Sequence, residues 1–246
     1  MPVIIGLVGD GIKSRKRISE AMSENFEIKE FNFLDIVKGI STFAFPQMDS
    51  TSLTYDKIEK TFKELGQEPI PVLRENAKRI LTSMIRYLGG DFRNYFTSVS
   101  SGKYAGGTYD TPAALLKRVD EIILDMMPDF HSLVLSSKIK MDDVGVVSDF
   151  DREDDVQSFR TKYPNFFLVE VWGKSKGSNG GKWYQNLDRN IMEKVDDLSP
   201  EDLLLKTEEV LKTVKDKVRR EVPFPTEDFM SGDQHLRNGR FGFERR

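Results

Sequence analysis

A turn rich in glycine and lysine, residues 9–16, follows an apolar run at the start of the chain, residues 3–8. Such a continuous apolar run predicts a buried strand of a parallel sheet, and the pattern around Ile18 predicts a helix after the turn. Where a strand leads through a glycine-containing turn into a helix, backbone N–H groups and the helix dipole can bind an anion such as phosphate. The candidate phosphate-binding residues are Gly9, Gly11, Lys13, Ser14 and Lys16.

The phosphate-loop motif G-x-x-x-x-G-K-[ST] can be matched to this turn in two ways, and neither match is complete. Counted from Gly6, the second glycine falls correctly on Gly11, but Ile12 stands before the pair Lys13 and Ser14. In this register Lys13 is the phosphate lysine.

Counted from Gly9, five residues instead of four come before Arg15 and Lys16, so Lys16 is the phosphate lysine only with one residue too many, and Arg15 takes the place of the second glycine. An arginine there adds a side chain where the backbone must approach phosphate closely. Spacing alone leaves the register open. It also leaves open the alternative of a plain strand-to-helix turn whose lysines are solvated.

A second cluster of charges, residues 149–155, follows another apolar run, residues 144–147. Ligands of open parallel sheets bind outside the carboxyl ends of the strands, so this cluster is a second candidate site. The carboxylates of Asp149 and Asp155 could position Mg²⁺ there, and Arg152 could pair with a phosphate. The alternative is an acidic helix N-terminus that the helix dipole favours.

Composition excludes several classes of site. The chain has 246 residues, no cysteine and only two histidines, so disulfides, thiolate metal sites and a cysteine nucleophile are excluded. No set of metal-ligating residues is predicted. The net charge of −3 gives no bulk attraction to nucleic acid, which we do not expect as a partner. No apolar run reaches the ~20 residues of a membrane helix and no signal-peptide pattern is present, so we expect a cytoplasmic protein without a membrane partner.

Apolar strands alternate with helical patterns along the chain, which predicts a parallel sheet covered by helices on both faces. Strands are expected at residues 3–8, 28–33, 144–147 and 166–171. Helices are expected around Ile18, at 34–40, 56–65 and 71–88, after Thr111-Pro112, through Val156 and Phe159, and from Ser199-Pro200 to about 220. The expected fold class is α/β, with three α/β/α layers and helical insertions.

The order of these features resembles the phage deoxynucleoside monophosphate kinases, within the P-loop nucleoside monophosphate kinase superfamily. The turn at 9–16 corresponds to that family's phosphate loop, and residues 31–38 resemble its second strand and the helix start after it. Residues 79–91 resemble the family's helix end that faces the monophosphate substrate. Residues 146–155 look like its strand ending in "D-x-R-x-x-x-E".

The resemblance continues toward the C-terminus and spans most of residues 1–215. The loop at 173–182 and the helix after Ser199 fall where the family has its lid and its final helix. The resemblance implies a P-loop kinase-like domain at 1–221, with a helical substrate-binding region at about 43–140 and a lid-like loop at about 173–190. Residues 222–246 are expected to form an extended tail.

The resemblance implies phosphoryl transfer from ATP to a deoxynucleoside monophosphate in phage nucleotide metabolism, with ATP as co-substrate and Mg²⁺ as cofactor. The implied catalytic residues are Lys16 (or Lys13 in the other register), Asp149 and Arg152. The implied substrate-binding residues are Arg79, Arg86 and Asp155. Nucleotides are therefore the expected partners, in the cytoplasm of the host cell.

The chain also departs from the family's pattern. Arg15 stands at the glycine before the Lys16 position, and Arg86 and Gly90 replace a glutamine and a threonine of the substrate-facing helix end. The alternative function is therefore a catalytically degenerate kinase-fold protein that acts as a structural or protein-interaction subunit. The tail at 222–246, which combines phenylalanine with arginine, is the expected contact for a protein partner or a second copy of the chain.

Overall fold

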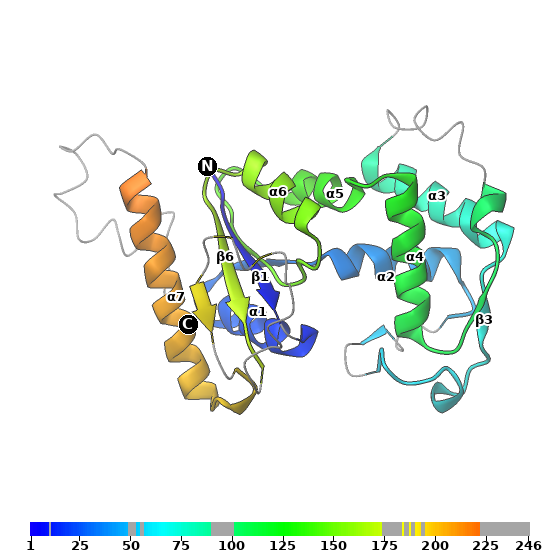
Figure 1. Cartoon of the computed structure of the whole chain (residues 1–246), viewed down its shortest axis with the longest axis horizontal. Coiled ribbons are helices and arrows are strands. Elements are labelled where there is room, and N and C mark those ends of the chain that lie inside the picture. Colours follow the sequence, from blue (N-terminus) through cyan, green and yellow to red (C-terminus); the bar gives the residue numbers. More distant parts are fainter. Residues whose placement is uncertain are drawn as a thin grey trace. The chain divides into compact units, whose positions relative to one another are not determined.

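The computed structural model describes residues 1–9, 11–48, 53–54, 57–89, 101–173, 184, 187, 190–192 and 195–221 (Figure 1). The chain divides into two compact units, one of Met1–Asn32 with Lys138–Arg246 and one of Phe33–Ser137. The second unit is an insertion in the first. Most of the expected lid and the whole tail at 222–246 lie outside the described residues.

The first unit is built on a parallel sheet. Its strands are β1 (Val3–Gly9), β2 (Lys29–Phe31), β5 (Val144–Val147), β6 (Phe166–Val171) and β7 (Asn190–Met192). They lie in the order β2-β5-β1-β6-β7, and every neighbouring pair is parallel. The most apolar strands, β1, β5 and β6, are the three in the middle, where both faces of a strand are covered.

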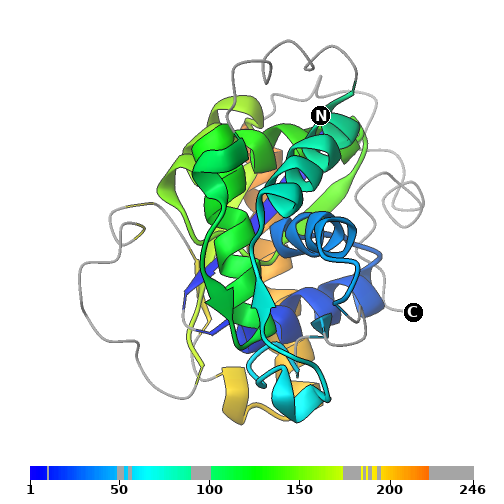
Figure 2. The ribbon, with the colours of Figure 1, turned by 90° about the vertical axis from the view of Figure 1, so that its right-hand side faces the viewer.

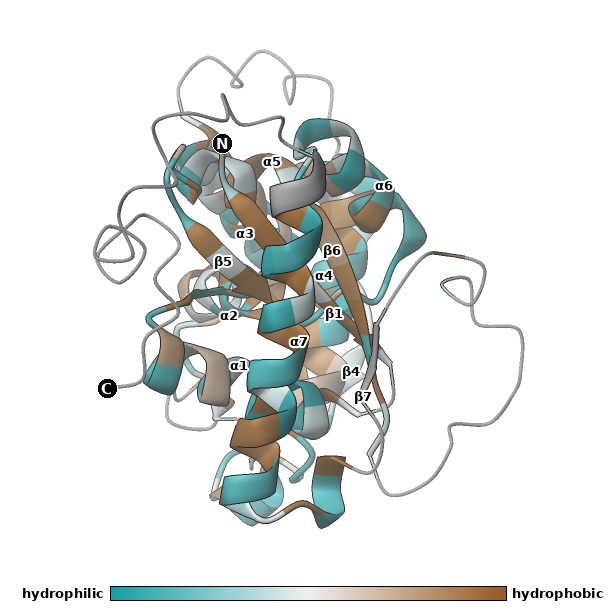
Figure 3. Cartoon of the chain, turned by 90° about the vertical axis from the view of Figure 1, so that its left-hand side faces the viewer, coloured by the Kyte–Doolittle hydropathy of each residue, from teal (hydrophilic) through white to brown (hydrophobic). Residues whose placement is uncertain are grey.

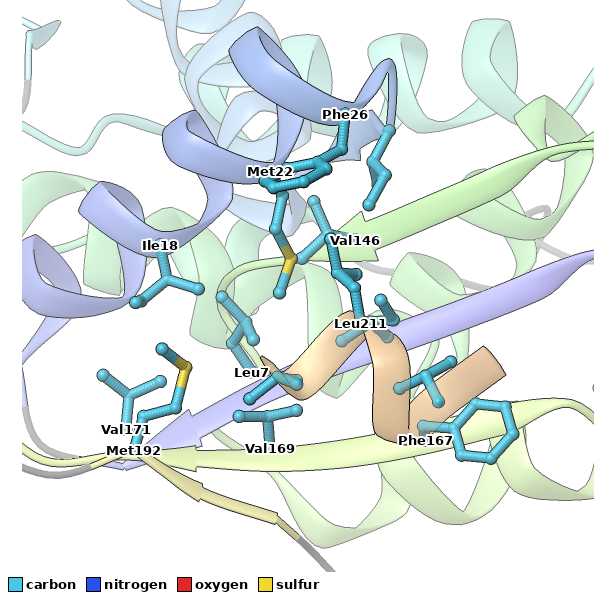
Figure 4. Packing of buried hydrophobic residues seen from close by; sticks show 14 of the residues in the cluster. Leu7, Ile18, Met22, Phe26, Val146, Phe167, Val169, Val171, Met192 and Leu211 are labelled. Carbon is cyan, nitrogen blue, oxygen red and sulfur yellow. The ribbon is translucent and has the colours of Figure 1, made fainter. Parts of the chain in front are cut away.

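Helices α1 (Ile12–Phe26) and α7 (Pro200–Glu221) cover one face of the sheet. Alternate strand residues such as Leu7 and Val169 pack there against Ile18 and Met22 of α1 and Leu211 of α7 (Figure 4). Figure 3 shows α7 with alternating teal and brown bands beside largely brown strands, as expected for a helix with one buried side.

Helix α6 (Glu153–Lys162) covers the opposite face. Phe159 of α6 packs edge-on against Phe150, with ring centroids 5.1 Å apart, and Phe150 packs in the same way on Phe166 of β6. Gly6 of β1 provides the room, because a Cβ atom at this position would lie only 2.8–2.9 Å from the rings of Phe166 and Phe150. The unit therefore has the three α/β/α layers predicted from the sequence, an arrangement like that of P-loop kinases.

The chain order of the strands defines where a ligand of such a sheet binds. Strand β1 leads through α1 to β2, beyond β5, whereas β5 leads through α6 across β1 to β6. The two connections run in opposite directions and on opposite faces. Ligands of open α/β sheets bind outside the carboxyl ends of the strands at such a point, here β1 and β5.

The second unit, described by itself, is mainly helical (Figure 2). Helix α2 (Phe33–Ala44) packs on both α3 (Arg74–Leu88) and α4 (Pro112–Met126). A small antiparallel pair, β3 (Ile70–Pro71) and β4 (Thr108–Tyr109), and the 3-10 helices η2 (Lys63–Leu65) and η4 (Ser101–Tyr104) complete it. Helix α5 (Phe130–Lys138) leads back to the first unit.

Two sequence expectations for this unit were wrong. The helix expected from residue 71 begins at Arg74, because Ile70 and Pro71 pair with β4 and the Asn76 side chain accepts a hydrogen bond from the Leu73 N–H group at 2.7 Å. Leu73, expected in the apolar stripe, is 58% exposed. Of the helix expected at 56–65, only η2 is helical in the described residues.

Within the described part of the chain, no helix combines the length and the hydropathy that crossing a lipid bilayer requires.

Candidate functional site

The turn between β1 and α1 is shorter than the phosphate-loop motif. Only residues 10 and 11 separate Gly9, the last residue of β1, from Ile12, the first residue of α1. Gly6 lies inside β1, where it pairs with Val147 and Leu168. In neither register do the residues between the first glycine and the lysine form the open loop that the phosphate-loop motif describes, because most of them belong to β1 or to α1.

The two glycines of the turn have different roles. Gly9 has φ +118°, and a Cβ atom there would lie 2.2 Å from the carbonyl oxygen of Val171, so β1 and β6 can approach only at a glycine. Gly11 has φ +79° and is the N-cap residue of α1. Since glycine has no side chain to cap the helix, the N–H groups at the start of α1 are left for other partners.

Lys13 and Ser14 lie in the first turn of α1, whereas Arg15, Lys16 and Arg17 come after them. Each residue of an α-helix points about 100° away from the one before it, so the three consecutive basic side chains diverge. The side chain of Lys13 is exposed and makes no ion pair or hydrogen bond with the other described residues. Of the two lysines that the motif registers offer, Lys13 is the one at the N-terminal end of the helix.

Lys16 points to strand β2. Its Nζ atom donates to both carboxylate oxygens of Glu30, at 2.7 and 2.8 Å, and the two side chains are only 22% and 20% exposed. The Ser19 hydroxyl donates to Glu30 Oε1 at 2.9 Å, and the Ser148 hydroxyl approaches the same atom at 3.4 Å. Lys16 is thus part of a polar network between α1 and the ends of β2 and β5.

Ser14 points to the other side of β1. Its hydroxyl donates to Asp196 Oδ1 at 2.7 Å, in the 3-10 helix η6 (Val195–Asp197) that follows β7. The neighbouring Gly173, just after β6, leaves the space for this pair, since a Cβ atom there would lie 2.7 Å from Asp196 Oδ2 and 3.1 Å from Ser14 Oγ. Arg17 holds η6 in place by donating to the carbonyl oxygens of Val195 at 2.7 Å and Leu198 at 3.1 Å.

Arg15 reaches the end of β5. Its Nη1 atom donates to the carbonyl oxygen of Phe150 at 3.2 Å and lies 2.8 Å from Asp151 Oδ1. The Arg15 side chain is 4% exposed, whereas that of Asp151 is 66% exposed. A guanidinium therefore lies where ligands of such a sheet are expected.

The acidic cluster lies directly beyond β5. Asp149 is buried, and Arg152 is the N-cap residue of α6, with Nη1 3.7 Å from the buried Asp155 and Nη2 3.4 Å from Asp154. Asp154 and Asp155 lie in the first turn of α6, where the helix dipole favours carboxylates. This geometry is compatible with both interpretations of the sequence, a ligand site beyond the strand and an acidic helix N-terminus.

The predicted substrate residues Arg79 and Arg86 both lie on α3, in the second unit. Arg79 Nε is 4.0 Å from Glu75 Oε1, one turn earlier on the helix. The Arg86 guanidinium lies over the ring of Phe43 on α2, 4.5 Å from its centroid. The other predicted residues, from Gly9 to Asp155, all belong to the first unit.

No protein-family model matches this sequence, and a search of curated proteins finds no significant match. The function must therefore be argued from the residues themselves.

The oxygen atoms near β1 and β5 are of the kind that would fit a magnesium ion bound to nucleotide phosphates. Mg²⁺ in such sites is held by one or two carboxylates together with phosphate oxygens. Asp149 beyond β5 and the Ser14–Asp196 pair beside α1 supply carboxylate and hydroxyl oxygens of this kind. No group of three or more acidic or histidine side chains in the described ranges could hold a metal alone.

Sequence reasoning missed Glu30 and Asp196, the partners of Lys16 and Ser14. A charged residue inside the strand expected at 28–33 was a usable signal for Glu30, since a carboxylate that a sheet and its covering helix largely bury is stable only when paired. Asp196 had no such signal, because it follows β7, which the sequence did not reveal. Arg15 was noticed only as a departure from the motif.

Proposed function

We propose that this chain binds nucleotides and transfers the terminal phosphoryl group of ATP to a deoxynucleoside monophosphate. One observation carries the proposal: the uncapped N-terminus of α1, with the exposed Lys13 beside it, lies at the carboxyl end of the central strand β1. Backbone N–H groups, the helix dipole and an adjacent lysine are the groups that bind nucleotide phosphates in such folds.

The proposal uses Lys13 rather than Lys16 as the phosphate lysine. Lys16 is engaged by Glu30 through two short hydrogen bonds, and moving it to a phosphate would leave a half-buried carboxylate without its cation. The side chain of Lys13 is not paired with a carboxylate of the described residues. Asp149 supplies the carboxylate for a Mg²⁺ ion bound to the phosphates, and Ser14 supplies a hydroxyl beside it.

Phosphoryl transfer requires mainly positioning and electrostatic stabilisation of charge on the transferred group, which basic side chains supply. Arg152, at the start of α6, is the guanidinium that we assign to the acceptor phosphate or to the transferred group. The choice of a deoxynucleoside monophosphate, the implied roles of Arg79 and Arg86, and the setting in a phage-infected cytoplasm rest on the family resemblance alone.

The rival function is a kinase-fold protein without catalysis, acting as a structural or interaction subunit. One observation favours it: the buried Arg15 side chain lies at the switch point of the sheet, tied to Phe150 and Asp151. If Asp151 never leaves Arg15, phosphate is kept from the end of β5.

Two measurements separate these functions. Thermal unfolding is followed with ATP and Mg²⁺ and, separately, with dAMP, dCMP, dGMP and dTMP, because a ligand at 100 times its Kd adds about 2.7 kcal/mol to the stability of the native state. Formation of ADP is then followed with each monophosphate as acceptor. The kinase proposal predicts stabilisation by ATP and turnover with at least one acceptor. Stabilisation without turnover, or the absence of both, would refute catalysis.

A further inference from the structure

Arg15 is a buried cation with an unusual set of partners. Its side chain is 4% exposed, and its two hydrogen-bond acceptors, the Phe150 carbonyl and the Asp151 carboxylate, are both reached through Nη1. The Nε atom is buried and has no hydrogen-bond partner among the described residues. A guanidinium carries five N–H donors, so this one is under-used.

Such an arrangement is costly for a structural side chain. Removing a charge from water is favourable only when the ion is well paired and its remaining donors are satisfied. Asp151 is a poor permanent partner, because its own side chain is 66% exposed and water competes for its carboxylate. Arg15 is therefore a buried cation whose present anionic partner, Asp151, is weakly bound.

We propose that Arg15 is the anchor of a phosphate-binding site beyond the carboxyl end of β5, and that Asp151 occupies the guanidinium when no phosphate is bound. A tetrahedral phosphate offers several oxygens at once and can therefore reach both Nη1 and the unused donors of Arg15, which one carboxylate oxygen does not. Binding exchanges one anion for another: the phosphate displaces Asp151, whose exposed carboxylate turns to water.

The ligand class is a phosphate, either free or as part of a nucleotide. The identification of a nucleotide as the ligand rests on the proposed function, because the site lies at the same end of the sheet as the α1 N-terminus. The exchange at Arg15 does not rest on it. Free phosphate therefore tests the site without any assumption about catalysis.

The test is a calorimetric titration of the full chain with inorganic phosphate, ATP and dTMP in separate experiments. The ionic strength is held at ~0.1 M, where interactions between distant surface charges are largely screened. Three variants are compared with the unaltered chain. Asp151→Asn removes the internal anion and Arg15→Gln removes the receptor. Glu153→Gln makes the same change of charge as Asp151→Asn at an exposed residue of α6 whose side chain makes no hydrogen bond or ion pair with the described residues.

We expect Asp151→Asn to bind phosphate roughly three- to tenfold more tightly, the factor that loss of one competing exposed ion pair allows. Glu153→Gln should change affinity less than about twofold, and Arg15→Gln should abolish binding. Equal affinities for Asp151→Asn and Glu153→Gln, or no phosphate binding by any variant, would overturn the site and leave Arg15 as a structural tie. If Arg15→Gln does not fold, the comparison of Asp151→Asn with Glu153→Gln alone decides whether the phosphate site exists.

The outcome is separable from that of the proposed function. Phosphate binding that tightens in Asp151→Asn, in a protein that forms no ADP, would support the Arg15 site and refute the kinase. ADP formation whose apparent ATP affinity is the same in Asp151→Asn and Glu153→Gln, without free-phosphate binding, would support the kinase and refute the site. The ATP and dTMP titrations then show which nucleotide phosphate occupies Arg15.

Discussion

The Nζ atom of Lys16 lies 2.7 Å from Oε1 of Glu30 and 2.8 Å from its Oε2, and this pair joins α1 to β2. Because both side chains are mostly buried, removal of one leaves the other without a counter-ion in a poorly solvated place. Lys16 therefore stabilises the fold through this pair, although one register of the phosphate-loop motif gives it a catalytic role.

The first prediction concerns this pair. Lys16→Met should lower the free energy of unfolding by about 1–3 kcal/mol, and in a double-mutant cycle with Glu30→Gln the coupling energy should be at least about 1 kcal/mol. The matched control is Lys78→Met in α3, whose partner Glu75 is 3.7 Å away and exposed, with an expected loss below about 0.5 kcal/mol. Urea unfolding of the unaltered chain and of the four variants (Lys16→Met, Glu30→Gln, the double variant and Lys78→Met) gives these free energies. Equal losses for the two lysines would contradict a structural role for Lys16.

The second prediction concerns the close approach of β1 and β6. Gly9→Ala should destabilise the protein by at least about 3 kcal/mol, because the new methyl group meets the Val171 carbonyl in a backbone conformation that only glycine adopts easily. Gly66→Ala is the control: its φ is also positive, at +74°, but no atom lies within 4 Å of the added Cβ, so a loss of about 1 kcal/mol is expected. If the two substitutions cost the same, the contact with Val171 is not what requires a glycine.

The third prediction concerns pH. Asp143 is buried, accepts from the Lys140 N–H group at 2.8 Å and is paired with Lys29. Burial raises the pKa of this carboxyl, but the hydrogen bonds from Lys29 and Lys140 outweigh it, so the pKa lies below the ordinary value of 3.8. A pKa that is lower in the folded state gives stability that is complete above the unfolded pKa and is lost as the pH falls through the folded one.

Asp143→Asn should therefore lower the free energy of unfolding near neutral pH by about 1–2 kcal/mol. The difference from the unaltered chain should shrink when the pH is lowered from about 5 to about 2, because the native carboxyl becomes protonated there. Asp142→Asn, at the exposed neighbouring residue, should show neither effect. A difference that stays constant with pH would mean that the charge of Asp143 contributes nothing.

The central strands were predictable from sequence because burial on both faces makes nearly all of their residues apolar, Glu170 of β6 being the charged exception. Expectation and structure agree to the residue for β5 and β6, whose runs of valine, phenylalanine and leucine have no helical spacing. The start of α4 was also predictable, because Thr111 caps the helix by accepting from the Ala114 N–H group at 3.1 Å and Pro112 begins it.

Other features depend on tertiary contacts and leave little trace in the local sequence. Strand β7 has only three residues, Asn190–Met192, and exists through its pairing with β6. The later start of α3 depends on β4, more than 30 residues away along the chain. In the candidate site, the glycines and lysines after β1 were recognisable from the sequence. The direction in which each basic side chain points was not, because it depends on tertiary contacts.

The two lysines illustrate why the site could be only partly predicted. Motif spacing could not choose between Lys13 and Lys16, because the length of the turn decides which of them lies at the helix N-terminus. Because α1 begins at Ile12, Lys13 is the lysine that lies at the helix N-terminus. Lys16 is instead paired with the carboxylate of Glu30. Both facts depend on the packing of α1 against the sheet.

Nucleotide phosphates are expected to bind at the N-terminus of α1, and a calorimetric titration with ATP and Mg²⁺ tests this most directly. The unaltered chain should bind, and Lys13→Ala should weaken binding about tenfold or more, equivalent to at least ~1.4 kcal/mol, without changing the free energy of unfolding. Lys212→Ala, at an exposed lysine of α7, should bind as the unaltered chain does. The absence of binding by the unaltered chain, or equal affinities for the two lysine variants, would contradict the account.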